Sequence, residues 1–137
     1  DRGPKIAGDP ELARLYAEHL EESREHQRLV EDRLDARGGS PSKLKDAAMR
    51  LGALNWGLFF AAQPDTPGKL AAFAYAFEFL EVGGYEQLKR VAQRAGDAET
   101  QQLAERILDD ERAMAGRLAD SFDRAVDATL AAQEVHA

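Results

Sequence analysis

Histidine and glutamate side chains interrupt an apolar helical face near the start of the chain. The face follows the alternating three- and four-residue spacing that places residues on one side of a helix in a bundle. Its members are Leu12, Leu15, His19, Glu22, His26 and Leu29. The leucines at both ends indicate that this face points into the protein, and Glu25 lies at its edge. We therefore expect two imidazoles and a carboxylate on a buried surface.

Two later segments also place acidic side chains among apolar ones. Glu78 and Glu81 are three residues apart, so they project from one side of a helix, and Tyr85 follows four residues later. The apolar side of that segment consists of Leu70, Phe73, Phe77, Gly84, Leu88 and Val91. In the last segment Glu111 is central, with Asp110 beside it. The apolar stripe around Glu111 is formed by Ala104, Ile107, Met114 and Leu118.

Carboxylates that converge in an apolar interior need a counter-charge. A buried carboxylate is costly, and it normally takes up a proton or finds a cation. A metal ion would relieve both the burial and the mutual repulsion. Carboxylate and imidazole ligands suit iron or manganese, and zinc also accepts them. Facing helices of a bundle are a known location for such a site.

Each group also has a purely structural interpretation. His19 and His26 could be neutral, hydrogen-bonded residues at a half-exposed edge. Glu22 and Glu25 could be surface charges paired with a nearby arginine, either Arg28 or Arg33. Taken alone, Glu78 is expected at the rim of the site. Glu81 and Glu111 are the least suited to a surface, because their helical neighbours are apolar.

The elements that must position these groups are predicted to be helices over about 10–37, 41–62, 67–95 and 97–132. Helix starts are marked by three pairs of a capping residue and a proline: Asp9-Pro10, Ser40-Pro41 and Thr66-Pro67. Gly38-Gly39 and Gly96 mark ends, and Asp97 can cap the last helix. No segment alternates as a strand would. Short connections favour antiparallel neighbours, so we predict an all-α, antiparallel four-helix bundle in a single domain over 1–137.

Composition excludes several classes of function. The chain has 137 residues and a formal net charge of −7, without a basic stripe, which argues against nucleic-acid binding. No apolar run reaches the roughly 18 residues that span a membrane. The absence of cysteine excludes disulfides and thiol chemistry. With no targeting segment visible, a cytoplasmic location is the default expectation.

Three motifs together resemble a known family. His19-Leu20-Glu21-Glu22-Ser23 resembles the His-x-x-Glu-Thr helix of the ferritin-like proteins typified by the YciE/YciF stress proteins. The segment from Glu78 to Tyr85 resembles their Glu-His-x-Glu-x-x-x-Tyr segment, with Phe79 where histidine is common. Asp109-Asp110-Glu111 resembles their paired-acid segment. The likeness runs from about Ile6 to Leu130.

The resemblance implies a ferritin-like bundle, a di-iron or related metal site and an association with stress responses. The metal ligands that it implies are Glu22, Glu81 and Glu111, followed by Glu78, His26 and Glu25. Family members usually have a further helix with an acidic residue before the point where this chain begins. The resemblance therefore predicts that this helix is missing from the sequence or is supplied by a second subunit.

Two functions remain open from the sequence. The first is a metal-binding ferritin-like protein, with a di-iron or di-manganese carboxylate site, that stores iron or reacts with oxygen or peroxide at a carboxylate-bridged metal pair. The second is a non-enzymatic helical module that oligomerises or docks a partner and has no functional metal site. Whether the protein is an enzyme stays undecided. We expect a homo-oligomer, a dimer in the simplest case, that binds neither nucleic acid nor membrane.

Overall fold

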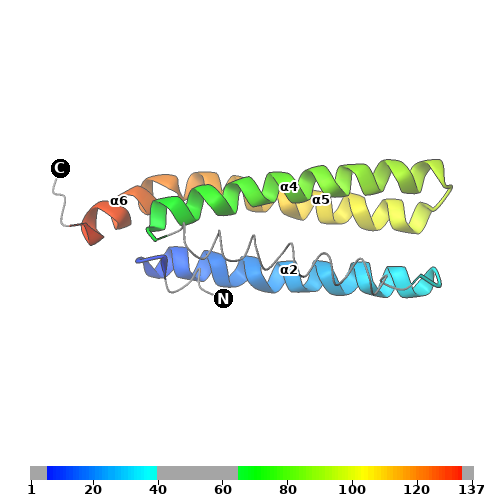
Figure 1. Cartoon of the computed structure of the whole chain (residues 1–137), viewed down its shortest axis with the longest axis horizontal. Coiled ribbons are helices and arrows are strands. Elements are labelled where there is room, and N and C mark those ends of the chain that lie inside the picture. Colours follow the sequence, from blue (N-terminus) through cyan, green and yellow to red (C-terminus); the bar gives the residue numbers. More distant parts are fainter. Residues whose placement is uncertain (1–5, 40–64, 134–137) are drawn as a thin grey trace.

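The computed structural model describes residues 6–39 and 65–133, and these two ranges contain helices and no strand (Figure 1). Helix α2 spans Pro10–Ala36, α4 spans Pro67–Arg94, α5 spans Ala98–Asp120 and α6 spans Phe122–Ala132. The helix predicted over about 41–62 lies outside the described residues. None of the helices in the described ranges is long and apolar enough to cross a membrane.

The three long helices begin at capping side chains. The Asp9 carboxylate accepts hydrogen bonds from the backbone N–H groups of Glu11 and Leu12, at 2.8 and 3.0 Å. Thr66 and Asp97 accept equivalent bonds at the starts of α4 and α5. These bonds satisfy N–H groups that have no partner inside the helix, so the local sequence determines where each helix begins.

A tight turn joins α4 to α5. Gly96 has φ = 68°, a left-handed conformation that glycine adopts without strain, and only Ala95–Asp97 separate the two helices. Because the turn is so short, α5 must return alongside α4 in the opposite direction.

The last predicted helix, over about 97–132, is two helices in the structure. The backbone N–H of Ser121 donates to the Leu118 carbonyl at 3.1 Å, and the Ser121 hydroxyl donates to the same oxygen at 2.8 Å. A serine hydroxyl that competes for a helix carbonyl bends or ends the regular ladder. The following helix α6 is tied to the start of α4, because the Gly68 N–H donates to Thr129 Oγ1 at 2.8 Å.

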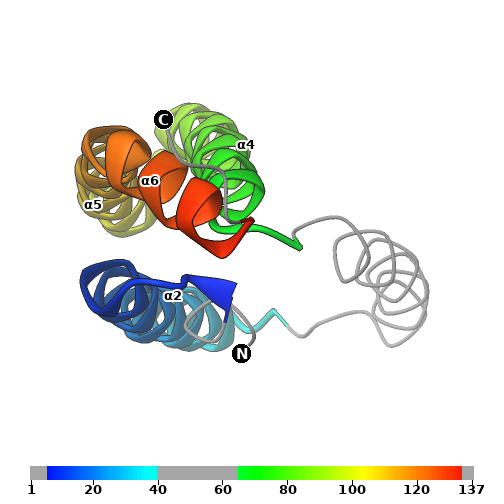
Figure 2. The same cartoon turned by 90° about the vertical axis from the view of Figure 1, so that its left-hand side faces the viewer.

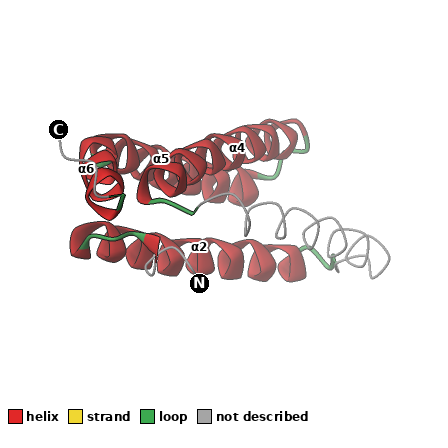
Figure 3. Ribbon diagram, turned by 60° about the vertical axis from the view of Figure 1, so that its left-hand side comes forward, coloured by secondary structure: helices red, strands yellow, loops and turns green. Residues whose placement is uncertain are grey.

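The long helices lie along one another. α4 and α5 pack side by side and antiparallel, and α2 extends beneath them in the same direction as α4 (Figure 1). The end view shows α2 opposite the α4–α5 pair (Figure 2). The short α6 packs on α4 at the end where α2 begins (Figure 3). Side chains from three separate segments therefore face a shared interior.

The interior changes character along its length. Near the start of α2 it is an apolar cluster that includes Leu12, Tyr16, Ala71, Met114 and Leu118. Farther along, three ionisable side chains are buried: His26, Glu78 and Glu111. At the far end Arg33 binds Thr100 at 2.8 Å, Asp97 at 2.5 Å and Glu99, which holds α2 to the start of α5. The buried ionisable groups thus lie between two structural anchors.

Candidate metal centre

Six side chains form a charged belt in the middle of the helices. They divide into two triads, and within each triad the ligand-type atoms all lie within 4.8 Å of one another. The first triad is Glu22, His26 and Asp110, and the second is Glu78, Glu81 and Glu111. Helix α2 contributes only to the first triad, α4 only to the second, and α5 contributes one residue to each.

Helical spacing explains how each helix supplies its part. Glu22 and His26 are four residues apart, and Glu78 and Glu81 are three apart, so each pair projects from one side of its helix. Asp110 and Glu111 are adjacent, and neighbours on a helix point about 100° apart. Asp110 and Glu111 therefore reach different triads from the same turn of α5.

The imidazole of His26 connects the two triads. Its Nδ1 lies 2.9 Å from Glu111 Oε1, and its Nε2 lies 3.1 Å from Asp110 Oδ2. The residue is only 4% exposed. A ring nitrogen donates only when it carries a proton, so both contacts are hydrogen bonds to ionised carboxylates only in the doubly protonated ring. His26 thus contacts a carboxylate of each triad.

Glu78 is the most unusual group in the belt. Its side chain is fully buried, and neither oxygen of the ionised carboxylate accepts a hydrogen bond within the described residues. His19 Nε2 lies 3.1 Å from Oε1, but not in hydrogen-bonding geometry. Burial raises the pKa of Glu78 to about 9, and a hydrogen bond between the protonated Glu78 carboxyl and Glu111, together with the charge of Glu111, adds to the shift. Such a group needs a proton or a cation.

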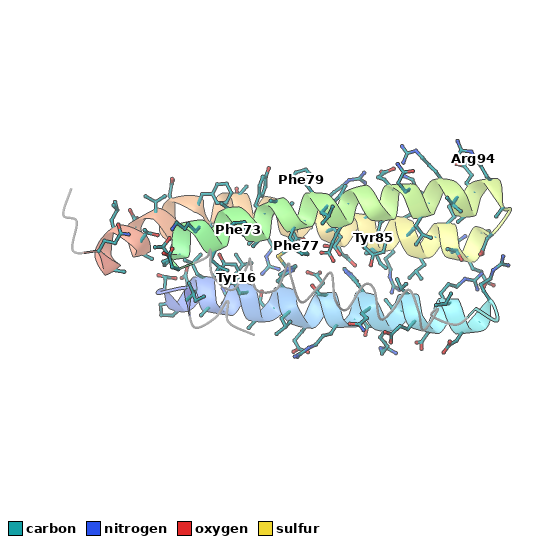
Figure 4. The ribbon with its side chains drawn as sticks, in the orientation of Figure 1. Tyr16, Phe73, Phe77, Phe79, Tyr85 and Arg94 are labelled. Carbon is teal, nitrogen blue, oxygen red and sulfur yellow. The ribbon has the colours of Figure 1, made fainter. Side chains whose placement is uncertain are left out.

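The surrounding groups experience the same crowding. Burial raises the pKa values of Glu81 and Glu22, and nearby carboxylates add to the effect. Burial also raises the pKa of Tyr85 on α4. Along the bundle, Tyr85 lies beyond the level of Tyr16 on α2, toward the end of α4 (Figure 4). Burial lowers the pKa of His19, which favours its neutral ring. The belt therefore contains more negative charge than its own cations offset.

Of the residues predicted as ligands, the structure brings together Glu22, His26, Glu78, Glu81 and Glu111. It does not bring Glu25 to either triad. The Glu25 carboxylate is half exposed and binds the guanidinium of Arg28 through contacts of 3.0 and 2.6 Å. An arginine three residues later on the same helix competes successfully for this side chain.

Asp110 and His19 are functional candidates that were not in the predicted ligand set. Both were visible in the sequence, Asp110 beside Glu111 and His19 on the inward face of the first helix. What revealed them is the packing: Asp110 reaches the His26 ring, and His19 reaches Glu78. Spacing along one helix does not report which neighbour a side chain meets on another.

The donor set fits a metal ion. Buried carboxylate oxygens that accept no hydrogen bond are the groups that a cation would satisfy, and Glu78 contributes two of them to its triad. Carboxylates and one imidazole are hard to intermediate ligands, which suit manganese and iron. The carboxylate and imidazole clusters could therefore hold a metal ion.

The comparison with known protein families gives a match over nearly the whole chain. The model of a domain of unknown function, DUF892, matches residues 4–131. No solved structure matches the chain. The match agrees with the all-helical architecture and with the inward acidic side chains on three helices. The chain therefore belongs to the DUF892 family, the ferritin-like family typified by the YciE/YciF proteins.

Proposed function

We propose that the protein binds iron or manganese in the charged belt, as a ferritin-like metal protein of the stress response. The observation that supports this proposal most strongly is Glu78, a fully buried residue whose ionised carboxylate accepts no hydrogen bond in the described part of the chain. A structure maintains such a group only if something offsets its cost. Two neighbouring carboxylates, Glu81 and Glu111, make a cation the natural partner.

The two triads suggest two positions for an ion. Glu78, Glu81 and Glu111 would hold one ion, and Glu22, His26 and Asp110 would hold the other. A bound iron or manganese pair would supply redox chemistry toward oxygen or peroxide. The protein would orient the ligands through His26, which contacts a carboxylate of each triad, and the apolar cluster around Tyr16 would limit water at one side.

Removing one carboxylate from each of two helices tests the proposal. We expect Glu81→Ala plus Glu111→Ala to abolish uptake of iron and manganese while the protein stays helical. The matched control is Glu31→Ala plus Glu105→Ala, which removes the same charge from exposed positions and should leave uptake unchanged. Metal content after loading and circular dichroism provide the two measurements. Unchanged uptake in the first variant would remove these residues from the site, and a metal-free wild type after loading would refute the proposal.

A non-enzymatic, self-associating module is the second candidate. It is favoured by large apolar side chains on α4 that the described structure leaves exposed: Leu80 is 67% exposed and Val91 is 62% exposed. Large exposed apolar surfaces often mark interfaces. We propose a homodimer as the assembly that covers them. Light scattering of the wild type and of Leu80→Glu would test this, since a monomeric wild type contradicts the proposal.

A further inference from the structure

We propose that His19 is a nitrogen ligand of the ion that binds at Glu78, so that α2 supplies one imidazole to each metal position. This inference rests on the proposed function. It assigns a role to a histidine that neither triad contains, and it predicts a metal preference for the more deeply buried position.

The contact between His19 and Glu78 carries the inference. His19 Nε2 lies 3.1 Å from Glu78 Oε1, close enough for both atoms to bind one ion. The two atoms do not have hydrogen-bond geometry, and neither oxygen of the ionised Glu78 carboxylate accepts a hydrogen bond in the described residues. The His19 side chain is 21% exposed, so its ring lies largely inside the bundle. A nitrogen that approaches such a carboxylate without bonding to it is placed as a second ligand would be.

The position of His19 on α2 supports the same assignment. His19 and His26 are seven residues apart, which is close to two helical turns, so both point from one face of the helix. The rise between them is about 10.5 Å. The contact of its Nε2 with Glu78 Oε1 at 3.1 Å places the His19 ring beside the charged belt. The two imidazoles thus reach the belt at different levels along α2.

A nitrogen ligand would change which ions this position prefers. A site of three carboxylates alone suits magnesium and calcium as well as manganese. Imidazole favours transition metals over magnesium. His19 would therefore help the buried position to reject magnesium in favour of manganese or iron.

Manganese binding to the metal-free full chain tests the role of His19. The variants are His19→Gln and, as a control on the exposed side of the same helix, Gln27→Ala. We expect calorimetry with Mn²⁺ to show two ions bound to the wild type and to the control. One of them should bind His19→Gln at least about a hundredfold more weakly, since loss of an outer-shell partner alone costs about ten- to a hundredfold. Pulsed EPR of bound Mn²⁺ should show coupling to directly bound imidazole nitrogen that decreases in His19→Gln. Circular dichroism checks that the helices remain.

The outcomes separate this inference from the proposed function. Two ions bound to His19→Gln with unchanged affinities would overturn the role of His19 while leaving the metal site intact. Weaker binding with unchanged nitrogen coupling would also overturn it, because His19 would then only position Glu78. A wild type that binds no Mn²⁺ would refute both. If His19→Gln does not fold, His26→Gln gives the same test: nitrogen coupling there supports His19, and its absence overturns the inference.

Discussion

Replacing Glu78 by glutamine should make the metal-free protein less sensitive to pH. Glutamine has nearly the shape of glutamic acid but never carries a charge. Burial, helped by the Glu111 carboxylate, raises the pKa of Glu78 from 4.5 to about 9. In the metal-free protein this side chain therefore holds a proton at neutral pH that the unfolded chain has already released.

The sign and size of the effect follow from proton linkage. A carboxyl with a raised pKa gives its full stabilisation below the unfolded value of 4.5, and that stabilisation is lost as the pH rises toward about 9. One proton contributes up to about 1.4 kcal/mol per pH unit to the free energy of unfolding. Between pH 6 and 8 the wild type should lose up to about 2.7 kcal/mol more than Glu78→Gln does.

Chemical denaturation in the presence of a chelator, at several pH values from 5 to 9, measures this difference. Glu81 and Glu22 shift in the same direction, so the comparison with Glu78→Gln isolates the contribution of Glu78. Glu105→Gln, an exposed change on α5, serves as the control and should follow the wild type. If the wild type and Glu78→Gln give parallel curves, Glu78 is not held protonated in the folded protein and the reasoning fails.

Three further changes test the structure around the belt. Arg33→Ala should lower the free energy of unfolding by about 1–3 kcal/mol, because it removes the guanidinium that binds Asp97 and Thr100 across the helices and leaves Arg37 as the remaining guanidinium beside Asp97; urea denaturation measures this. Tyr16→Phe should leave stability unchanged or raise it by up to about 1 kcal/mol, since the buried Tyr16 hydroxyl has no partner in the described residues; a clear loss would contradict this. Gly83→Ala should raise the free energy of unfolding by about 0.5–1 kcal/mol, because Gly83 is exposed within α4 and alanine favours the helix more than glycine does. A lower melting temperature of this variant would show that position 83 has no room for a methyl group.

Helix starts were predictable from the sequence because their determinants are local. Asp9 and Thr66 cap helices that begin at the next residue, as expected. The break at Ser121 was not predictable from the helix signals, because neither proline nor glycine occurs there. It depends on a hydroxyl that bonds the Leu118 carbonyl, and most serines in helices do not interrupt them.

The candidate site was partly predictable, and the remainder depended on how the helices rotate. Glu111 is buried as its apolar neighbours indicated. Glu78, expected at the rim, is fully buried, whereas Phe77 and Val91 from the predicted apolar side are 45% and 62% exposed. In the described structure, α4 thus presents a face to α2 and α5 that includes Glu78. Rotating α4 about its axis by the angle between adjacent residues, about 100°, changes which side chain points inward. The packing of the neighbouring helices determines this rotation.

The charged belt also determines the alignment of the helices along their long axes. Apolar side chains tolerate sliding, because one leucine can replace another in the same space. A shift of α2 by one turn, about 5.4 Å, would separate His26 from Asp110 and Glu111 and break both contacts of its ring. The charged belt thus specifies one alignment of the three helices along their axes. A single buried polar residue specifies one pairing in a coiled coil in the same way.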